Sequence, residues 1–127
     1  YAVVRYSNEP QLRQTITVDE LPPEKESYPH WSQEFALWHS AKFGQRRWAA
    51  EVDSPAALKA FLRGFDCWAF VLTDSISFFE EAGSLQVYSV QDGLSPRQSY
   101  LLTNKYPDRS NLNILKRFCE AVSSYTE

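Results

Sequence analysis

The sequence predicts an α/β fold with a sheet that is at least partly parallel. Apolar segments of strand length alternate along the chain with segments that carry apolar residues at helical spacing. The clearest helix start is Asp53-Ser54-Pro55, where a capping hydroxyl precedes a proline at the first helical position. Residues 67–72 are continuously apolar over the length of one strand, which is typical of a central strand covered on both faces. Helices that alternate with strands in this way pack on the faces of a sheet.

The other strands are predicted from short runs rich in β-branched, aromatic or alternating apolar residues. These runs comprise residues 1–6, 15–18, 46–52, 85–90 and 99–103. Between them, Pro22-Pro23 should end any helix because proline cannot continue one. We interpret the charged segment that follows, residues 24–27, as a solvated loop.

Helices are predicted from capping residues and apolar spacing. The first should span residues 33–43, because Ser32 can cap its start and Gly44 can end it. A short helix over residues 76–82 should follow the capping sequence Thr73-Asp74-Ser75. The apolar residues at helical spacing are Leu58, Phe61 and Leu62 after Ser54, and Leu115, Phe118, Cys119 and Val122 in a last helix that begins near Ser110.

Composition and charge exclude several classes of protein. The chain has 127 residues, a formal net charge of −3 and a sequence pI of about 5.4. A hydrophobic content of 43% excludes an intrinsically disordered chain. No apolar run approaches the ~20 residues that a membrane helix needs, so we expect no membrane partner. Without a Lys/Arg-rich face, these residues should not contact DNA themselves.

The cysteines and the first residues indicate the compartment. Cys67 and Cys119 lie far apart and form no CxxC motif, so a disulfide framework is not expected and both thiols should be inert. The chain begins inside an apolar run, with neither an initiator Met nor the pattern of a signal peptide. We therefore expect a cytoplasmic protein and a chain that has been cut from something longer.

Motifs for catalysis are missing from the sequence. It contains neither GxSxG nor HExxH, and neither His30 nor His39 has a second ligand at metal-like spacing in the same segment. We therefore expect no catalytic residue, no metal ion and no cofactor, and we interpret the chemistry of the chain as binding.

The order of motifs over almost the whole chain, most of them between Ile16 and Tyr125, resembles the C-terminal part of the effector-binding domain of LysR-type transcriptional regulators. The resemblance depends on the order and spacing of several segments together. These are an extended segment with a polar loop (residues 3–10), Ile16-Thr17-Val18-Asp19-Glu20-Leu21, a loop and helix (29–44), Glu51-Val52-Asp53-Ser54 before the helix at 57–64, the strands at 68–72 and 99–103, and the last amphipathic helix.

The resemblance implies a two-lobed fold like that of type 2 periplasmic binding proteins, in which a small molecule binds between the lobes. On this mapping the chain crosses between lobes near residues 1–6 and again near residues 99–102. Residues 1–98 would form the second lobe with its first crossover. Residues 99–127 would form the return crossover and the C-terminal helix of the first lobe, and the rest of that lobe lies outside this sequence.

The function implied is the sensing of a small-molecule effector by a bacterial regulator. Such a regulator contacts DNA through an N-terminal helix-turn-helix, which this sequence lacks, and the full-length protein should be a homodimer or tetramer. Two alternatives from other classes stay open, a solute-binding protein for transport and a small enzyme on the same scaffold. A signal peptide upstream would favour the transport protein, and a helix-turn-helix upstream would favour the regulator.

The candidate ligand-binding residues implied by the resemblance come from three segments. They are Pro29, His30, Trp31 and Ser32 in the loop before the first helix, Asp53 and Ser54 at the start of the second, and Thr73 after the apolar strand. Each has a structural alternative: the hydroxyl groups can cap helices, His30 can be solvated and Trp31 can pack in the core. Likewise, Phe35, Trp38 and Trp48 can belong either to the core or to an antiparallel dimer interface.

Overall fold

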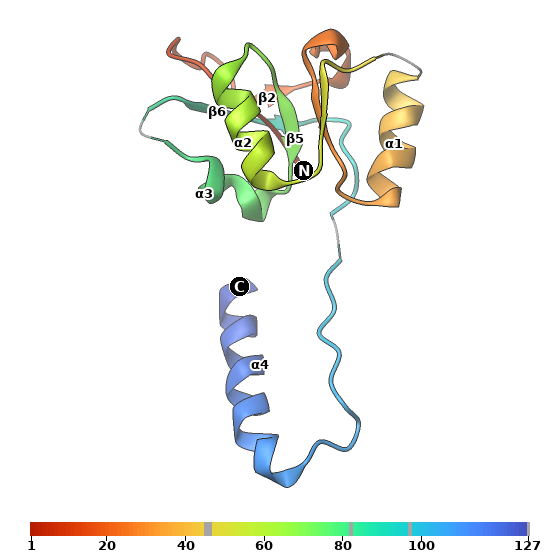
Figure 1. Cartoon of the computed structure of the whole chain (residues 1–127), viewed down its shortest axis with the longest axis vertical. Helices are drawn as coiled ribbons and strands as arrows, with labels where there is room; N and C mark the ends of the chain where they lie inside the picture. Colours follow the sequence, from red (N-terminus) through yellow and green to blue (C-terminus); the bar gives the residue numbers. More distant parts are fainter. Residues whose placement is uncertain (45–46, 82, 97, 127) are drawn as a thin grey trace. The chain divides into compact units, whose positions relative to one another are not determined.

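The computed structural model describes residues 1–44, 47–81, 83–96 and 98–126. The chain divides into two units, residues 1–96 and 97–127, which we describe separately. The first unit contains a mixed sheet with helices on it, so the predicted α/β class is confirmed (Figure 1).

Four strands form the main sheet of the first unit, in the order β2-β6-β1-β5. The opening strand β1 (Ala2–Tyr6) is interior and runs antiparallel to both neighbours, β5 (Ala69–Val71) and β6 (Leu85–Val90). The short strand β2 (Thr15–Ile16) pairs in parallel with β6. The expected strand at residues 67–72 is thus shorter than predicted, but all three residues of β5 are buried, as a strand covered on both faces should be.

A second, parallel pair of strands continues this arrangement. β3 (Ser27–Pro29) pairs with β4 (Ala50–Val52), and a parallel bridge between Glu26 and Trp68 joins the β3 segment to the β5 segment. All strands except β1 therefore point the same way. Their carboxyl ends meet at one edge, which we call the carboxyl edge, and the start of β1 lies there too.

Two capped helices follow the parallel strands, as predicted. In α1 (Gln33–Phe43), the Ser32 hydroxyl oxygen accepts a hydrogen bond from the Phe35 amide at 3.0 Å. In α2 (Pro55–Gly64), the Ser54 hydroxyl accepts from the Ala57 amide at 3.2 Å. α1 ends at Gly44, whose φ of +65° is a conformation that glycine adopts at little cost.

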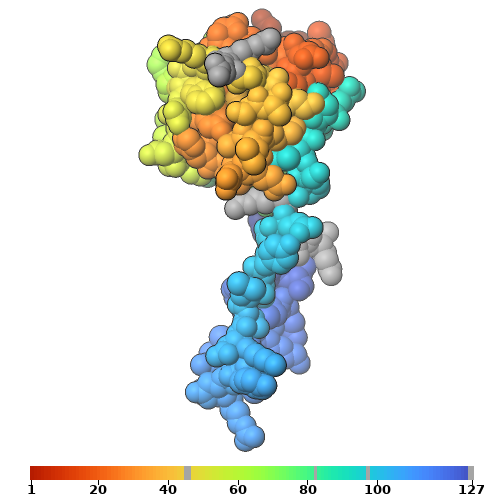
Figure 2. Space-filling view, turned by 90° about the vertical axis from the view of Figure 1, so that its right-hand side faces the viewer, coloured from red at the N-terminus to blue at the C-terminus, as the bar shows by residue number. Residues whose placement is uncertain are grey.

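The two helices cover opposite faces of the sheet, because neighbouring residues of a strand point to opposite sides. Val3 and Phe70 pack with Phe35 of α1, whereas Val4 and Val71 pack with Leu58 of α2. Figure 2 shows the first unit from the side that α1 covers. Each face thus has its own apolar core.

Four local predictions were wrong or incomplete. Residues 24–27 are not a solvated loop: η2 (Pro23–Lys25) leads into β3, and Glu26 and Ser27 are buried. The helix expected over residues 76–82 is limited to α3 (Ile76–Phe79), preceded by η3 (Thr73–Ser75), and Ala82 lies outside the described residues. β4 begins only at Ala50, and Arg46, where the strand was expected to start, also lies outside them. The strand expected over residues 15–18 is limited to Thr15–Ile16, because Val18 begins the 3-10 helix η1 (Val18–Glu20), which was not predicted.

The second unit contains η4 (Arg109–Asn111) and α4 (Leu112–Thr126), which confirms the last predicted helix. The strand expected at residues 99–103 was wrong, since the described residues 98–126 contain no strand. A strand needs a neighbouring backbone to complete its hydrogen bonds, and this unit offers none in its described part. Among the described residues of the whole chain, no helix is long and apolar enough to cross a membrane.

Candidate functional site

Five of the seven predicted ligand residues line one small pocket at the carboxyl edge. Its volume is about 30 Å³, and its lining consists of Pro29, His30, Trp31, Val52, Asp53, Ser54, Pro55 and Leu58. The register of the parallel pair explains the convergence, because Pro29 lies opposite Val52 and the two strands end together. Ser32 and Thr73 are described residues at the same edge, but they lie outside this lining.

The loop after β3 is held by a hydrogen bond to the sheet. The indole Nε1 of Trp31 donates a hydrogen bond to the carbonyl oxygen of Phe70 at 2.7 Å. Trp31 therefore packs against the sheet, which is the structural alternative expected for it from the sequence. His30 remains half exposed, and its Nε2 lies 2.5 Å from a carboxylate oxygen of Glu51 in β4. The loop therefore presents one imidazole and one indole to the carboxyl edge.

The second segment divides its roles between two residues. Ser54 caps α2, whereas the neighbouring Asp53 is exposed, and the structure records no ion pair of its carboxylate with a described residue. Asp53 is thus available to a ligand. Thr73 is exposed at the start of η3, and the described part of η3 and α3 receives no side-chain cap, so the capping alternative for Thr73 is wrong.

The arrangement at the carboxyl edge suits polar recognition. α1 and α2 both begin there, and the first amides of a helix lack intrahelical acceptors and favour an anion. A volume of 30 Å³ is the space of about one water molecule, whereas sites that enclose a small molecule occupy ~300–1,000 Å³. This pocket alone therefore forms one wall of a site for anything larger.

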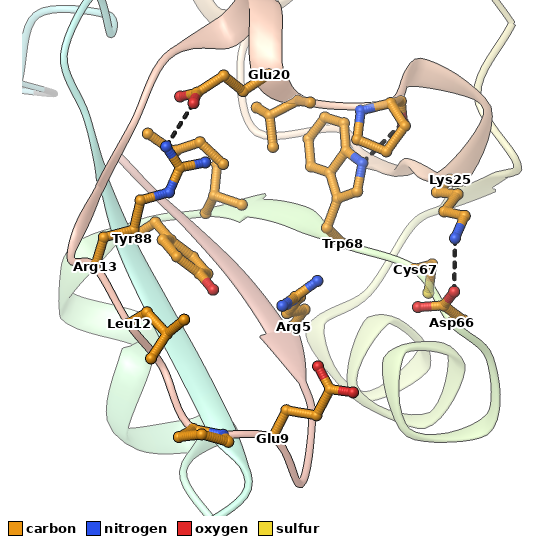
Figure 3. Close-up of a pocket in the computed structure, with 15 residues that line it drawn as sticks. Arg5, Glu9, Leu12, Arg13, Glu20, Lys25, Asp66, Cys67, Trp68 and Tyr88 are labelled. Carbon is orange, nitrogen blue, oxygen red and sulfur yellow. Dashed lines mark hydrogen bonds and ion pairs between the residues drawn. The ribbon is translucent and has the colours of Figure 1, made fainter.

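A second, larger pocket of about 600 Å³ lies on the α1 side of the sheet, toward the opposite edge (Figure 3). It is lined by Val3, Arg5, Glu9, Pro10, Leu12, Arg13, Ile16, Glu20, Leu21, Pro22, Lys25, Asp66, Cys67, Trp68 and Tyr88. None of these side chains was singled out as a ligand-binding residue from the sequence. The available signal was a charged or polar residue within an apolar strand, namely Arg5 in β1 and Gln86 in β6.

The aromatic residues with two open interpretations pack within the first unit. Phe35 is fully buried, and Trp38 packs edge-on against Phe70 with 5.3 Å between ring centroids. Trp48 stacks on Tyr28 at 4.1 Å. The core interpretation is therefore confirmed for Phe35, and the other two rings pack against that core.

Comparisons with protein-family models, with curated proteins and with solved structures found no match. Any assignment of function therefore depends on the chemistry of the two pockets and on the order of the strands.

Proposed function

We propose that the chain is the ligand-sensing region of a LysR-type transcriptional regulator, with residues 1–98 as one lobe of a two-lobed, periplasmic-binding-protein-like domain. The observation that carries the proposal is the convergence of Pro29, His30, Trp31, Asp53 and Ser54 on one pocket at the carboxyl edge. Ligands of open α/β sheets bind outside the carboxyl ends of the strands. The small-molecule effector would therefore bind against this edge.

The size of the pocket supports a site shared between two lobes. With about 30 Å³, the carboxyl edge can contact an effector but cannot enclose it. A second lobe closing over His30 and Asp53 would supply the remaining walls. Effector binding would then change the relative geometry of the lobes and of the DNA-binding heads.

The exposed side chains of the second unit also support this proposal. α4 is amphipathic, yet Ile114 is 68% exposed and Phe118 is 53% exposed. Apolar faces of this kind are stable when covered by other elements. In the proposed protein, residues 99–127 belong to the first lobe, whose other elements would cover α4.

The decisive experiment is to sequence the coding DNA on the 5′ side of the codon for Tyr1. A winged helix-turn-helix followed by half of an α/β lobe would support the regulator. A signal peptide would overturn it in favour of a transport protein.

A binding experiment tests the site on the protein expressed from the complete reading frame. A panel of metabolites is screened by thermal shift, and the affinity of the best stabiliser is measured by calorimetry for Asp53→Asn and for Asp19→Asn. Asp53→Asn should weaken binding at least about tenfold, because a lining carboxylate is lost. Asp19→Asn, a matched change on the exposed part of η1, should leave the affinity unchanged. Equal affinities in both variants would contradict the proposed site.

A further inference from the structure

The 600 Å³ pocket contains the guanidinium group of Arg5, which is held by a hydrogen bond at its Nε. Arg5 Nε donates a hydrogen bond to the side-chain oxygen of Gln86 at 2.7 Å. Gln86 is only 3% exposed and is itself fixed, because its oxygen also accepts from the Tyr88 hydroxyl at 3.0 Å and its amide donates to the Glu9 carbonyl at 2.7 Å. The guanidinium is thus oriented before any ligand arrives.

The outer side of this guanidinium forms no recorded ion pair with a described residue, and the guanidinium carbon lies 5.9 Å from the centroid of the Tyr88 ring. Figure 3 shows Arg5 in the middle of the pocket, and the structure records no hydrogen bond from its two Nη groups to a described residue. Two parallel N–H groups of arginine match the two oxygens of a carboxylate, and such charge-assisted pairs are the strong ones. Arg5 therefore offers a preformed site for a carboxylate.

Among the described residues, the remaining charges of the lining leave one carboxylate without a recorded ion pair. Arg13 forms an ion pair with Glu20, and Lys25 forms one with Asp66 at 2.7 Å. Glu9 is exposed, and its carboxylate makes no recorded ion pair with a described residue. Figure 3 shows this carboxylate on the side of the pocket that faces Arg5. The pocket thus pairs one available cation with one available anion.

Apolar groups form the rest of the walls. The indole N–H of Trp68 is already donated to the Pro22 carbonyl at 2.8 Å, so the ring offers the pocket an apolar surface. Tyr88, Ile16 and Leu21 add further apolar surface, and the rim carries Leu12, which is 93% exposed. An apolar ligand group would be removed from water by contact with these side chains.

We infer that this pocket binds a free α-amino acid with an apolar side chain. Its carboxylate binds the Nη groups of Arg5, its ammonium group pairs with Glu9, and its side chain lies against Trp68 and Tyr88. The volume of 600 Å³ is in the range of small-molecule sites. This site is lined by different residues from the carboxyl edge and lies wholly within residues 3–88, so it does not depend on the proposed function.

Calorimetry on the 127-residue chain tests the inference with three related probes. L-Phenylalanine should bind. 3-Phenylpropanoate lacks the ammonium group and L-phenylalaninamide lacks the carboxylate, so each should bind at least about tenfold more weakly. No heat of binding for L-phenylalanine up to about 10 mM would overturn the inference. So would equal binding of 3-phenylpropanoate, which would indicate a site for simple carboxylic acids.

Variants assign each charge to its role. Arg5→Gln should weaken L-phenylalanine binding at least about tenfold, whereas Arg63→Gln, at an exposed arginine outside the pocket, should not change it. Glu9→Gln should weaken binding of L-phenylalanine but leave that of 3-phenylpropanoate unchanged. Because Glu9 is exposed and Gln86 contacts only its backbone, this variant should fold even if Arg5→Gln does not. Unchanged L-phenylalanine affinity in Glu9→Gln would refute the pairing with the ammonium group.

One more variant separates this site from the proposed effector site. Asp53→Asn lies at the carboxyl edge and should bind L-phenylalanine as the unaltered chain does. A loss of L-phenylalanine binding in Asp53→Asn together with full binding in Arg5→Gln would place the amino acid at the carboxyl edge and overturn this inference.

Discussion

His39 Nε2 lies 2.6 and 2.8 Å from the two carboxylate oxygens of Glu26, inside the core of the first unit. Glu26 is 1% exposed and His39 is 3% exposed, and the rings of Tyr28 and Phe43 pack against the imidazole. Burial raises the pKa of the Glu26 carboxyl above its usual range, and the hydrogen bond from His39 acts in the opposite direction. The pair links the segment before β3 to the middle of α1.

We expect His39→Leu to destabilise the first unit by about 3–5 kcal/mol at about pH 7, because Glu26 loses its partner while it stays buried. A raised pKa in the folded state means that folding favours the protonated carboxyl, so stability is lost as pH rises through that pKa. The loss in His39→Leu should therefore be smaller at about pH 5. Urea unfolding at both pH values measures this.

Glu26→Gln is the matched control for that prediction. Glutamine carries no charge and can still form a hydrogen bond with the imidazole of His39, so it should cost less than His39→Leu at about pH 7. A His39→Leu protein as stable as the unaltered chain at about pH 7 would contradict the role of the pair.

Removing the cap of α1 should cost about 1 kcal/mol. Ser32→Ala leaves the Phe35 amide without its acceptor at 3.0 Å, and N-cap changes of this kind cost ~0.5–2 kcal/mol. Ser40→Ala, at an exposed position of the same helix, should be neutral or slightly stabilising because alanine favours helix. Equal unfolding free energies for the two variants would show that the cap contributes nothing.

The α1 side of the core should be sensitive to a cavity at Phe35. This ring is fully buried and stacks on Tyr1 with 5.2 Å between centroids. Phe35→Ala should lower the unfolding free energy by about 3–5 kcal/mol, the usual cost of removing a buried aromatic side chain. Leu37→Ala on the same helix, at a side chain that is 67% exposed, should change it by less than about 0.5 kcal/mol. Similar losses in both would contradict the placement of α1.

Cys67 should resist thiol reagents while the chain is folded. It is buried, and burial raises the pKa of its thiol, so little reactive thiolate forms at neutral pH. In Cys119→Ser, where Cys67 is the remaining thiol, reaction with Ellman's reagent should be slow and should accelerate sharply in denaturing urea. In Cys67→Ser, the partly exposed Cys119 should react faster. Rapid labelling of Cys67 in the folded chain would contradict its burial.

Much of the fold could be predicted because its signals are local. The caps at Ser32 and Ser54 act over three residues, and the apolar spacing of Leu58 and Leu62 is visible within one helix. The prediction of a strand at 99–103 failed because its signal is not local. β-branched or apolar runs become strands only where another backbone pairs with them. The prediction of a solvated loop at residues 24–27 failed because Glu26 is buried against His39, which lies thirteen positions further along the chain.

The candidate sites divide in the same way. The resemblance implied ligand residues after β3 and β4, and the structure brings Pro29, His30, Trp31, Asp53 and Ser54 to one pocket at the carboxyl edge. The pocket around Arg5 was missed, because the hydrogen bond that orients it joins residues 81 positions apart, from Arg5 to Gln86.

Local sequence alone was enough to establish the class of the chain, the start and end of α1, the start of α2, and the alternation of apolar strands with helices. These features depend on groups within a few residues of each other, whose preferences act before the chain folds. The antiparallel insertion of β1 between β5 and β6, the burial of Glu26 against His39 and the charged pocket at Arg5 were decided by the tertiary structure. Each of these features requires contact between segments that are distant in the sequence. The free energy that favours such contacts comes from the burial of apolar side chains throughout the core.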